Sequence, residues 1–453
     1  MFEINKKTNL LERPNSVYVL NDVEEPELYR AFFPYDEVPR IAFNHRIVPI
    51  DMPDQIYITD TTFRDGQQSC APYSVEQIVT IFDMLHRLGG PNGIIRQSEF
   101  FVYSEKDRAA LRKCQERGYQ FPEVTSWIRA AHKDFELVKS LGIKETGMLV
   151  SCSDYHIFLK MNMTRRQAIE HYLSVVKDCI DEGIRPRCHL EDITRADFYG
   201  FVIPFVEELK RIMEDSGIPI KLRACDTMGY GVTFPGAVMP RSVQGIIHGL
   251  NKHAGFPPEL LEWHGHNDFY RAVANASQAW LFGCGAVNCS MLGIGERTGN
   301  TPLEAMVFEY AQLRGTLDGM DTRVISELAE YFEKELGYVI PPMTPFAGKN
   351  FNVTRAGIHA DGLLKNEEIY NIFNTELLLN RPSKTSVSNT SGAAGIAHSL
   401  NALLKLSGEK AYDKRHPLIE KIKTWVDAEY DSGRMTLIAD EELLALFEKY
   451  KDG

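Results

Sequence analysis

From Gln55 onward, short apolar runs alternate with longer stretches in which apolar residues recur at helical spacing. Short apolar runs bounded by turn residues predict strands, and the stretches between them predict helices. Eight strand–helix units follow one another in this part of the chain. The predicted strands cover residues 56–59, 94–101, 123–128, 146–151, 187–191, 221–225, 260–263 and 286–292.

The predicted helices cover residues 75–88, 105–117, 131–141, 165–182, 198–216, 241–252, 270–282 and 301–314. Parallel strands require a crossover connection, and a helix after each strand supplies one. Eight units over about 260 residues predict a (β/α)8 TIM barrel, which is an α/β fold. An open doubly wound sheet is the alternative, but no Gly-x-Gly-x-x-Gly turn follows the first strand.

The rest of the chain divides around this barrel. Residues 1–54 are mixed and interrupted by prolines, which predicts an N-terminal arm. Residues 55–315 form the predicted catalytic barrel, and residues 316–453 have a mostly helical pattern. We expect this C-terminal region to act as a lid and to take part in dimerisation.

Composition narrows the function classes. The net charge of the 453 residues is −12, which argues against general binding to nucleic-acid phosphates. The eight cysteines include no Cys-x-x-Cys pair, and free cysteines in a chain of this size indicate a reducing compartment. No stretch is long and apolar enough to span a bilayer, and no apolar signal core follows Met1. The sequence therefore predicts a cytoplasmic protein without membrane partners.

His264 and His266 are the most informative pair of residues. In an extended chain, residues two apart point to the same side, so two imidazoles would face one divalent metal. The alternative for an isolated His-x-His is one core side chain and one loop side chain. In a TIM barrel, catalytic groups lie at the carboxyl ends of the strands, where Arg64, Asp65 and the segment 295–300 also fall. Closure of the barrel would make the seventh, eighth and first strands neighbours.

Six segments carry a family resemblance. They are DTTFRDGQQ (60–68), RPRCHLED (185–192), CDTMGY (225–230), HGHND (264–268), GERTGN (295–300) and AGIHADG (356–362). Their order and their placement at successive strand ends resemble the DRE-TIM metallolyase superfamily over about residues 55–400. This superfamily includes isopropylmalate, homocitrate and citramalate synthases and hydroxymethylglutaryl-CoA lyase. The resemblance implies a metal-dependent enzyme that acts on an acyl-CoA.

The resemblance also implies roles for particular residues. The metal ligands would be Asp65, His264 and His266, with Asn300 as a possible further ligand. Arg64 would stabilise charge on the reacting carbonyl or enolate, Glu191 would assist proton transfer, and Thr227 would hydrogen-bond the substrate carboxylate. From the tail, His359 and Tyr370 would close over the site from the other subunit of a homodimer, with His359 as the proton-transfer group.

Within the superfamily, the chain resembles the synthases more than the lyases. The lyase branch carries a reactive cysteine in the loop after the eighth strand, and residues 292–300 contain none. The whole chain is most similar to the Re-face citrate synthases, which implies condensation of acetyl-CoA with oxaloacetate and then thioester hydrolysis to citrate and CoA. Homocitrate or 2-isopropylmalate synthase is the alternative. A non-catalytic barrel is a third hypothesis, but a scaffold has no need of this residue set.

The distal carboxylate of oxaloacetate requires a cation or several donors if it is buried. The candidates in the predicted strands are Arg187, His189 and Arg96. For each arginine the alternative is a surface or structural ion pair, and Glu99 is either an acid that contacts the metal ligands or a salt-bridge partner at the bottom of the barrel. Thr227 has the alternative of a simple turn hydroxyl.

The predicted ligands also indicate the kind of metal and the residues that support the ligands. Mixed nitrogen and oxygen ligands suit Mn²⁺, Co²⁺, Mg²⁺ or Zn²⁺, and we place Mn²⁺ first. We expect Asn267 and Asp268 to hydrogen-bond the imidazoles on the side that faces away from the metal. Asn300 has the alternative of capping the helix that is predicted from Thr301.

Overall fold

The computed structural model describes residues 3–5, 10–12, 17–31, 44, 47–355 and 357–451. The chain folds into two compact units, Met1–Asp321 and Thr322–Gly453. The described residues of the predicted arm belong to the first unit, together with the barrel. In this arm β1 (Glu3–Asn5) pairs with β2 (Leu10–Glu12) in antiparallel fashion.

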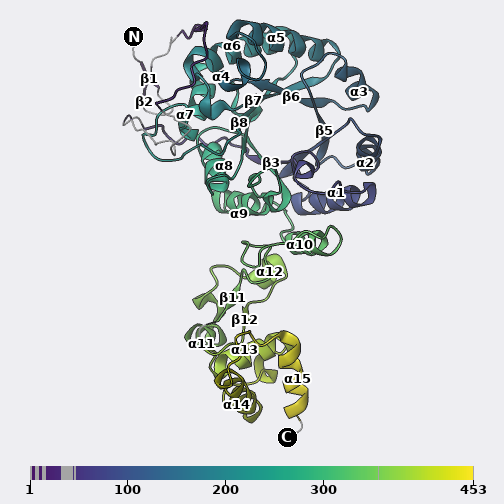
Figure 1. Cartoon of the computed structure of the whole chain (residues 1–453), viewed down its shortest axis with the longest axis vertical. Helices are drawn as coiled ribbons and strands as arrows, with labels where there is room; N and C mark the ends of the chain where they lie inside the picture. The colour runs from purple at the N-terminus through teal and green to yellow at the C-terminus, as the bar shows by residue number, and fades with distance from the viewer. Residues whose placement is uncertain are drawn as a thin grey trace. The chain divides into compact units, whose positions relative to one another are not determined.

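The first unit contains a closed barrel of parallel strands, as predicted (Figure 1). The order around the barrel is β10-β3-β4-β5-β6-β7-β8-β9. The strands are β3 (Tyr57–Asp60), β4 (Ile95–Phe100), β5 (Glu123–Ile128), β6 (Glu145–Ser151), β7 (Arg185–Glu191), β8 (Lys221–Asp226), β9 (Leu261–Gly265) and β10 (Ala286–Cys289). The last predicted strand is too long, because Leu292 has a left-handed φ of 57° inside a turn over Met291–Gly293.

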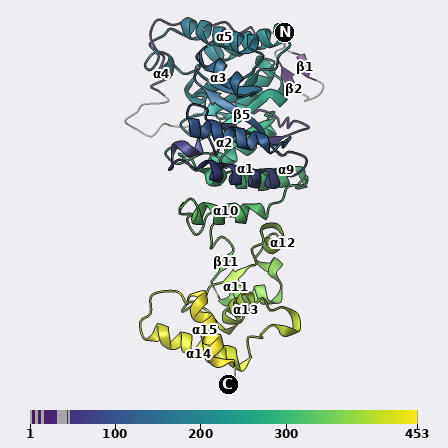
Figure 2. The same ribbon diagram turned by 90° about the vertical axis from the view of Figure 1, so that its right-hand side faces the viewer.

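Helices connect the strands and cover the outside of the barrel, as the side view in Figure 2 shows for α1, α2, α3 and α5. They are α1 (Val75–Gly89), α2 (Glu105–Glu116), α3 (Asp134–Ser140), α4 (Asp154–Ile157), α5 (Arg165–Asp181), α6 (Ile203–Ser216), α7 (Val243–His248), α8 (Ala272–Leu281) and α9 (Leu303–Arg314). Two predicted helices contain π-helical turns, at Phe198–Val202 before α6 and at Gly249–His253 after α7. Among the described residues, no helix combines the length and apolarity that crossing a bilayer requires.

The apolar core of the first unit lies between the strands and the surrounding helices. Buried strand residues such as Ile58, Leu222 and Trp263 contribute to it. The inward-facing positions are polar instead, because side chains alternate along a strand. This reverses the simplest expectation for a TIM barrel, in which branched apolar residues fill the interior.

The barrel interior holds paired charges. Arg187 Nη2 lies 2.7 Å from Glu99 Oε1, and Arg223 Nη1 lies 3.0 Å from Glu99 Oε2. Arg223 Nε also bonds Glu262 at 2.6 Å. Glu145 accepts from Arg187 at 3.2 Å and from Lys221 at 3.1 Å. Three cations therefore meet three carboxylates, which satisfies the requirement that buried charges be paired.

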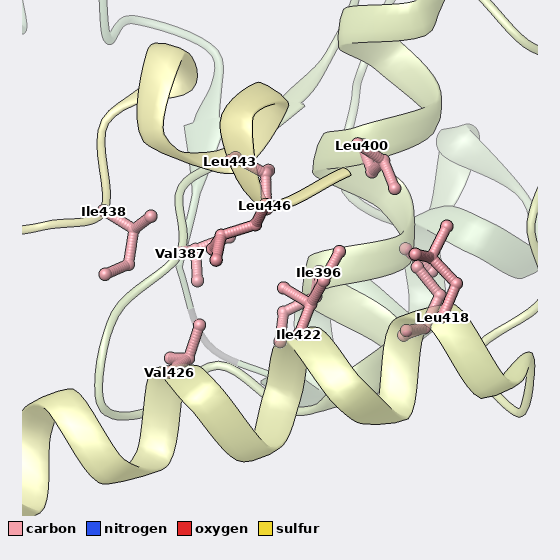
Figure 3. Packing of buried hydrophobic residues seen from close by; sticks show 11 residues of the cluster. Val387, Ile396, Leu400, Leu418, Ile422, Val426, Ile438, Leu443 and Leu446 are labelled. Carbon is pink, nitrogen blue, oxygen red and sulfur yellow. The ribbon is translucent and has the colours of Figure 1, made fainter. Parts of the chain in front are cut away.

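The second unit has its own core. Its elements are α10 (Val324–Lys334), β11 (Val353–Thr354), α11 (Gly357–Lys365), α12 (Thr375–Leu379), β12 (Lys384–Thr385), α13 (Ala393–Leu404), α14 (Pro417–Asp431) and α15 (Asp440–Tyr450). Figure 3 shows Ile396 and Leu400 of α13 near Leu418 and Ile422 of α14. Leu443 of α15 completes this apolar cluster. The predicted mostly helical character of this region is therefore confirmed.

The paired interior generates a stability prediction. Arg223→Met should lower the free energy of unfolding by about 3–5 kcal/mol, because Glu99 and Glu262 would lose a shared cation while staying buried. Denaturant titration followed by circular dichroism measures the loss. The matched control is Arg211→Met, whose exposed side chain pairs with Glu208 on α6 and should change stability by about 0.5 kcal/mol or less. Equal stability of the two variants would contradict this account of the interior.

Candidate functional site

Two buried imidazoles meet at the carboxyl end of β9. Nε2 of His264 lies 3.3 Å from Nε2 of His266. The other ring nitrogen of His264, Nδ1, lies 2.8 Å from Oδ1 of Asn288 on the neighbouring strand β10. The amide of Asn288 is oriented by its own donation to Thr59 Oγ1 at 2.9 Å, so its oxygen faces the histidine. His264 therefore carries its proton on Nδ1 and turns the lone pair of Nε2 toward His266.

Both imidazoles are suited to act as neutral ligands. Burial lowers the pKa of His264, and burial together with His264 lowers the pKa of His266 to about 3. A neutral imidazole keeps the lone pair that a metal ion requires. Nδ1 of His266 is buried and has no hydrogen-bond partner among the described residues.

Asp65 brings a carboxylate to the same place from the other side of the barrel closure. Its Oδ2 lies 3.9 Å from His264 Nε2 and accepts from Thr61 Oγ1 at 3.2 Å. Its Oδ1 is hydrogen-bonded to Arg64. Burial alone would raise the pKa of Asp65, but the charges of Arg64 and His264 outweigh it and hold the pKa below its usual value. Asp65 is therefore an anion at neutral pH.

Strand register explains how these groups converge. β10 pairs with β3 on one side and with β9 on the other, so the predicted contiguity of strands seven, eight and one is confirmed. At one level of the barrel Asn288 is paired with His264, His264 with Cys225, and Cys225 with Glu191. Residues far apart in the sequence thus stand side by side at the rim.

Asn300 contributes an unused oxygen. The backbone of Asn300 forms an isolated antiparallel β-bridge with the backbone of His266. The side-chain Nδ2 of Asn300 donates to the carbonyl of Ile294 at 3.2 Å. Its Oδ1 is buried without a hydrogen-bond partner among the described residues. The alternative role as a helix cap is wrong, because α9 has Pro302 at its N-cap and no capping side chain. A buried amide oxygen without a donor is suited to a cation.

The donor set fits a divalent cation of the mixed nitrogen and oxygen class. It comprises the Asp65 carboxylate, the two imidazoles and the free oxygen of Asn300. Among the described residues, no three His, Cys, Asp or Glu side chains already surround a common point as metal ligands do. Arg64 instead bonds Asp65, and His264 and His266 contact each other. Binding of an ion would therefore replace these contacts.

Arg64 is fixed at the rim by aromatic rings. Its guanidinium carbon lies 4.4 Å from the ring centroid of Trp127 and 5.9 Å from that of Phe101. Its side chain is only 11% exposed. A planar cation held this way is pre-organised to meet negative charge beside Asp65.

Glu191, the last residue of β7, is surrounded by donors. Ser151 donates to it, His156 Nδ1 lies 3.0 Å from its Oε2, and Lys160 Nζ lies 3.4 Å from the same oxygen. Burial alone would raise the pKa of Glu191, but the contacts with His156 and the other donors outweigh it and lower the pKa to about 2. His156 is not among the predicted site residues, although it follows the end of the fourth predicted strand, where site residues are expected.

Thr227 lies beside Glu191 at the end of β8. Its hydroxyl accepts from the backbone N–H of Asp192 at 2.9 Å. Nη2 of Arg297 donates to the carbonyl of Thr227 at 2.6 Å, which ties the loop after β10 to this rim. The Thr227 hydroxyl can donate to the carbonyl of Cys225 over a long distance of 3.5 Å.

The residues that were predicted to bind the distal carboxylate lie elsewhere in the barrel. Arg187 is fully buried and bonds Glu99 and Glu145 inside the barrel, as its structural alternative requires. His189 Nε2 lies 3.5 Å from Glu99, and burial together with Arg223 lowers its pKa to about 3. Arg187 is therefore engaged in the charge pairing of the interior, below the metal ligands, and His189 lies beside it as a neutral ring whose Nε2 has no hydrogen-bond partner among the described residues.

Arg96 also lies away from the rim. Its guanidinium carbon is 4.4 Å from the ring centroid of Tyr57 and 5.7 Å from that of Phe121, both near the amino ends of their strands. Glu99 is linked to the metal ligands, since Thr61 Oγ1 donates toward both Glu99 and Asp65. Glu99 is therefore an ion-pair partner of Arg187 and Arg223 that also contacts the Thr61 hydroxyl beside Asp65.

The imidazoles are not held by the two residues that we expected. Asn267 accepts from the backbone N–H of Ala272 at 3.3 Å, and Asp268 pairs with Arg297 at 3.0 Å. Asn288 holds His264 instead. The signal was present in the sequence, because Asn288 is a polar residue at an inward position of the eighth predicted strand, next to the strand of His264.

In the second unit, His359 and Tyr370 lie together. Their ring centroids are 4.4 Å apart, and Tyr370 is 45% exposed. Gly362 on α11 makes room for the tyrosine, since a Cβ there would lie 2.6 Å from the Tyr370 ring. The pair is accessible on the surface of this unit.

Comparisons with known proteins agree with this geometry. The HMGL-like family model matches residues 55–331. The chain is 59% identical to citrate (Re)-synthase of Clostridium kluyveri, over 95% of both chains, and 57% identical to citrate (Re)-synthase of Syntrophus aciditrophicus, over 96% of this chain and 69% of the relative.

A solved structure supports the fold. The crystal structure of HMG-CoA lyase from Bacillus subtilis is 20% identical, with a TM-score of 0.51, and covers 64% of this chain and 97% of the lyase. The barrel architecture is therefore shared with an enzyme of known structure. Together with the family match and the high identity to the two synthases, the ligand set at the rim leads to one conclusion: this chain belongs to the HMGL-like family of the DRE-TIM superfamily.

Proposed function

We propose that this chain condenses acetyl-CoA with oxaloacetate and hydrolyses the resulting thioester, which yields citrate and CoA. The observation that carries the proposal is the 59% identity over 95% of the chain to a protein named citrate (Re)-synthase. The rim residues supply the groups that this reaction needs. Residues 292–300 contain no cysteine, in contrast to the lyase pattern.

Asp65, His264, His266 and Asn300 would hold the metal, with Mn²⁺ as our first choice. When bound, a divalent cation would fix a 2-oxo acid and withdraw electrons from its ketone. The tautomer of His264, set by Asn288, presents Nε2 for this purpose. Asn300 Oδ1, which has no donor among the described residues, is available for the same purpose.

Arg64 would stabilise the negative charge that develops on the ketone oxygen. An arginine stays charged at any working pH, and its planar donors are directed. Contact with Trp127 holds the guanidinium, so little reorganisation is needed during the reaction. Thr227 would orient the substrate carboxylate, and it lies next to Glu191 on the same rim.

Proton transfer from the acetyl methyl group requires a base. Positioned bases typically contribute ~10²–10⁴-fold to the rate. We assign this role to His359, with Tyr370 as a relay, and propose that the pair is supplied by the second subunit of a homodimer. Glu191 would assist proton transfer as a fixed negative charge near the site, because its neighbours lower its pKa to about 2 and it stays deprotonated. We further propose that the enzyme acts in the cytoplasm.

A substrate panel tests the proposed function. Purified protein with Mn²⁺ and acetyl-CoA should release free thiol rapidly with oxaloacetate and form citrate, because the identity to citrate (Re)-synthases extends over nearly the whole chain. Thiol titration and chromatography of the product measure both. Omitting the metal is the control and should abolish turnover. Rapid release with 2-oxoisovalerate or 2-oxoglutarate and none with oxaloacetate would reject the proposal in favour of another synthase.

Asn288 provides a test of the metal assignment. Asn288→Ala should weaken Mn²⁺ binding by about 10–100-fold, because His264 would lose the acceptor that fixes its tautomer and ring orientation. Equilibrium dialysis measures the dissociation constant without reference to activity. Asn92→Ala is the control, since that exposed side chain bonds Asp318 far from the strand ends of the rim. Unchanged Mn²⁺ affinity in the Asn288 variant would remove His264 from the ligand set.

The titration of Glu191 tests the role of His156. Glu191 has a depressed pKa, so the carboxylate is present above that value and is lost as the pH falls through it. His156→Ala should raise the pKa of Glu191, and a ¹³C NMR titration of the labelled carboxylate measures this shift. The control is His132→Ala, whose exposed ring faces Asp178. An identical Glu191 titration in the His156 variant and the wild type would show that the pKa of Glu191 does not depend on His156.

A further inference from the structure

Part of the N-terminal arm is bonded to the barrel close to the candidate site. We define residues 17–31 as the arm segment. The backbone N–H of Asn21 donates to the carbonyl of Gly200 at 2.9 Å, and Nη1 of Arg165, the first residue of α5, donates to the carbonyl of Asn21 at 2.7 Å. The arm segment precedes residues 55–331, which the family model matches. Its contacts are therefore an addition to the barrel of the family.

Two further hydrogen bonds join the arm segment to α4, the short helix after β6. The backbone N–H of Glu27 donates to Asp154 Oδ2 at 2.8 Å, and the hydroxyl of Tyr155 donates to the carbonyl of Leu28 at 2.6 Å. Asp154 is buried, and its two carboxylate oxygens also accept from Nε and Nη2 of Arg165, both at 2.9 Å. The start of α4 is thus bonded to the arm segment and to α5 at the same time.

Arg165 makes this junction well defined. Its side chain is fully buried, and Nη1, which bonds the carbonyl of Asn21, also lies 2.9 Å from Oδ2 of Asp197. One guanidinium therefore joins the arm segment, α4 and the loop after β7. Buried charges require partners in good geometry, so the partners of Arg165 hold fixed positions.

The helix α4 carries His156, which faces two acidic residues of the rim. His156 Nδ1 lies 3.0 Å from Glu191 Oε2, and Nε2 lies 3.6 Å from Oδ2 of the buried Asp192. Asp192 is paired with Arg195 at 2.9 Å, and the guanidinium carbon of Arg195 lies 4.1 Å from the ring centroid of Tyr155. Tyr155 therefore contacts the rim with its ring and the arm segment with its hydroxyl.

We propose that the arm segment positions His156 against Glu191, and that Tyr155 is the positioning residue through which it acts. The hydroxyl of Tyr155 holds α4 on the arm segment, and α4 directs the next side chain, His156, toward the rim. The proposal rests on the proposed function only for the role of Glu191 in proton transfer. The competing account is an arm segment that stabilises the fold without effect on the rim.

A double-mutant cycle with Glu191 as the reporter distinguishes the two accounts. Tyr155→Phe removes the hydroxyl and keeps the ring, so the pKa of Glu191 should rise by part of the shift that His156→Ala causes. In the His156→Ala background, Tyr155→Phe should cause no further shift, because the path through His156 is already absent. A ¹³C NMR titration of the labelled Glu191 carboxylate in the full-length protein measures all four proteins. The matched control is Tyr119→Phe, whose hydroxyl bonds Asp83 on α1 at 3.1 Å and should leave the titration unchanged.

Hydrogen exchange reports on the arm segment itself. The amide of Glu27, which donates to Asp154, should exchange about 2–10-fold faster in Tyr155→Phe than in the wild type, through loss of a neighbouring hydrogen bond. Mass spectrometry of peptides from residues 17–31 measures this rate. Exchange at the wild-type rate would show that Tyr155 does not hold the arm segment and would overturn the proposal.

The remaining outcomes separate positioning from stabilisation. An unchanged Glu191 titration in Tyr155→Phe would overturn the proposal, whatever the exchange rate. A rise in the pKa of Glu191 that is equal with and without His156 would also overturn it, because the effect would then bypass His156. A rise that requires His156 would support it. Turnover does not enter these measurements, so a wild-type protein that forms no citrate would reject the proposed function and leave the positioning result intact.

Discussion

Closure of the barrel between β10 and β3 is the constraint on which the candidate site depends. Closure makes β9, β10 and β3 consecutive neighbours, so that His264, Asn288 and Asp65 approach one another from distant parts of the sequence. Strand register then sets the level at which they meet. An open sheet with the same strands would separate Asp65 from the histidines. The donor set is thus a consequence of topology, and each residue type matters only because closure places it there.

A second feature is the pairing of opposite charges inside the barrel, below the rim that carries the candidate metal ligands, although Arg187 Nε and Arg223 Nη2 have no hydrogen-bond partner among the described residues. Below the rim, Arg187 and Arg223 are matched by Glu99 and Glu262, and their mutual attraction offsets the cost of burying charge. At the rim, Asn300 Oδ1 has no donor among the described residues. The Thr61 hydroxyl contacts both Glu99 of the interior and Asp65 of the rim. The ion-paired Glu99 therefore helps to position the Asp65 carboxylate through Thr61. At the rim, polar groups that lack a hydrogen-bond partner are available to bind a ligand.

The pattern of residues was sufficient to predict the fold and to nominate the ligand set, since periodicity reveals strands and helices and since strand ends of a TIM barrel share one rim. It was insufficient for the hydrogen-bond partners of those residues. Asn267 and Asp268 were expected to hold the imidazoles because they adjoin the histidines in sequence, whereas Asn288 is adjacent only across the sheet. Arg187 illustrates the same point, because a strand arginine is a candidate substrate ligand until the carboxylates of neighbouring strands are placed beside it. Contacts between strands follow from register, which no local pattern encodes.

The most direct measurement of the central claim is X-ray absorption spectroscopy of the Mn²⁺-loaded protein in solution. The account predicts a coordination shell of nitrogen and oxygen atoms with the multiple-scattering signal of two imidazoles, reduced to one imidazole in His266→Ala. A shell of oxygen atoms alone, identical in the wild type and in that variant, would contradict the convergence of these side chains on one cation.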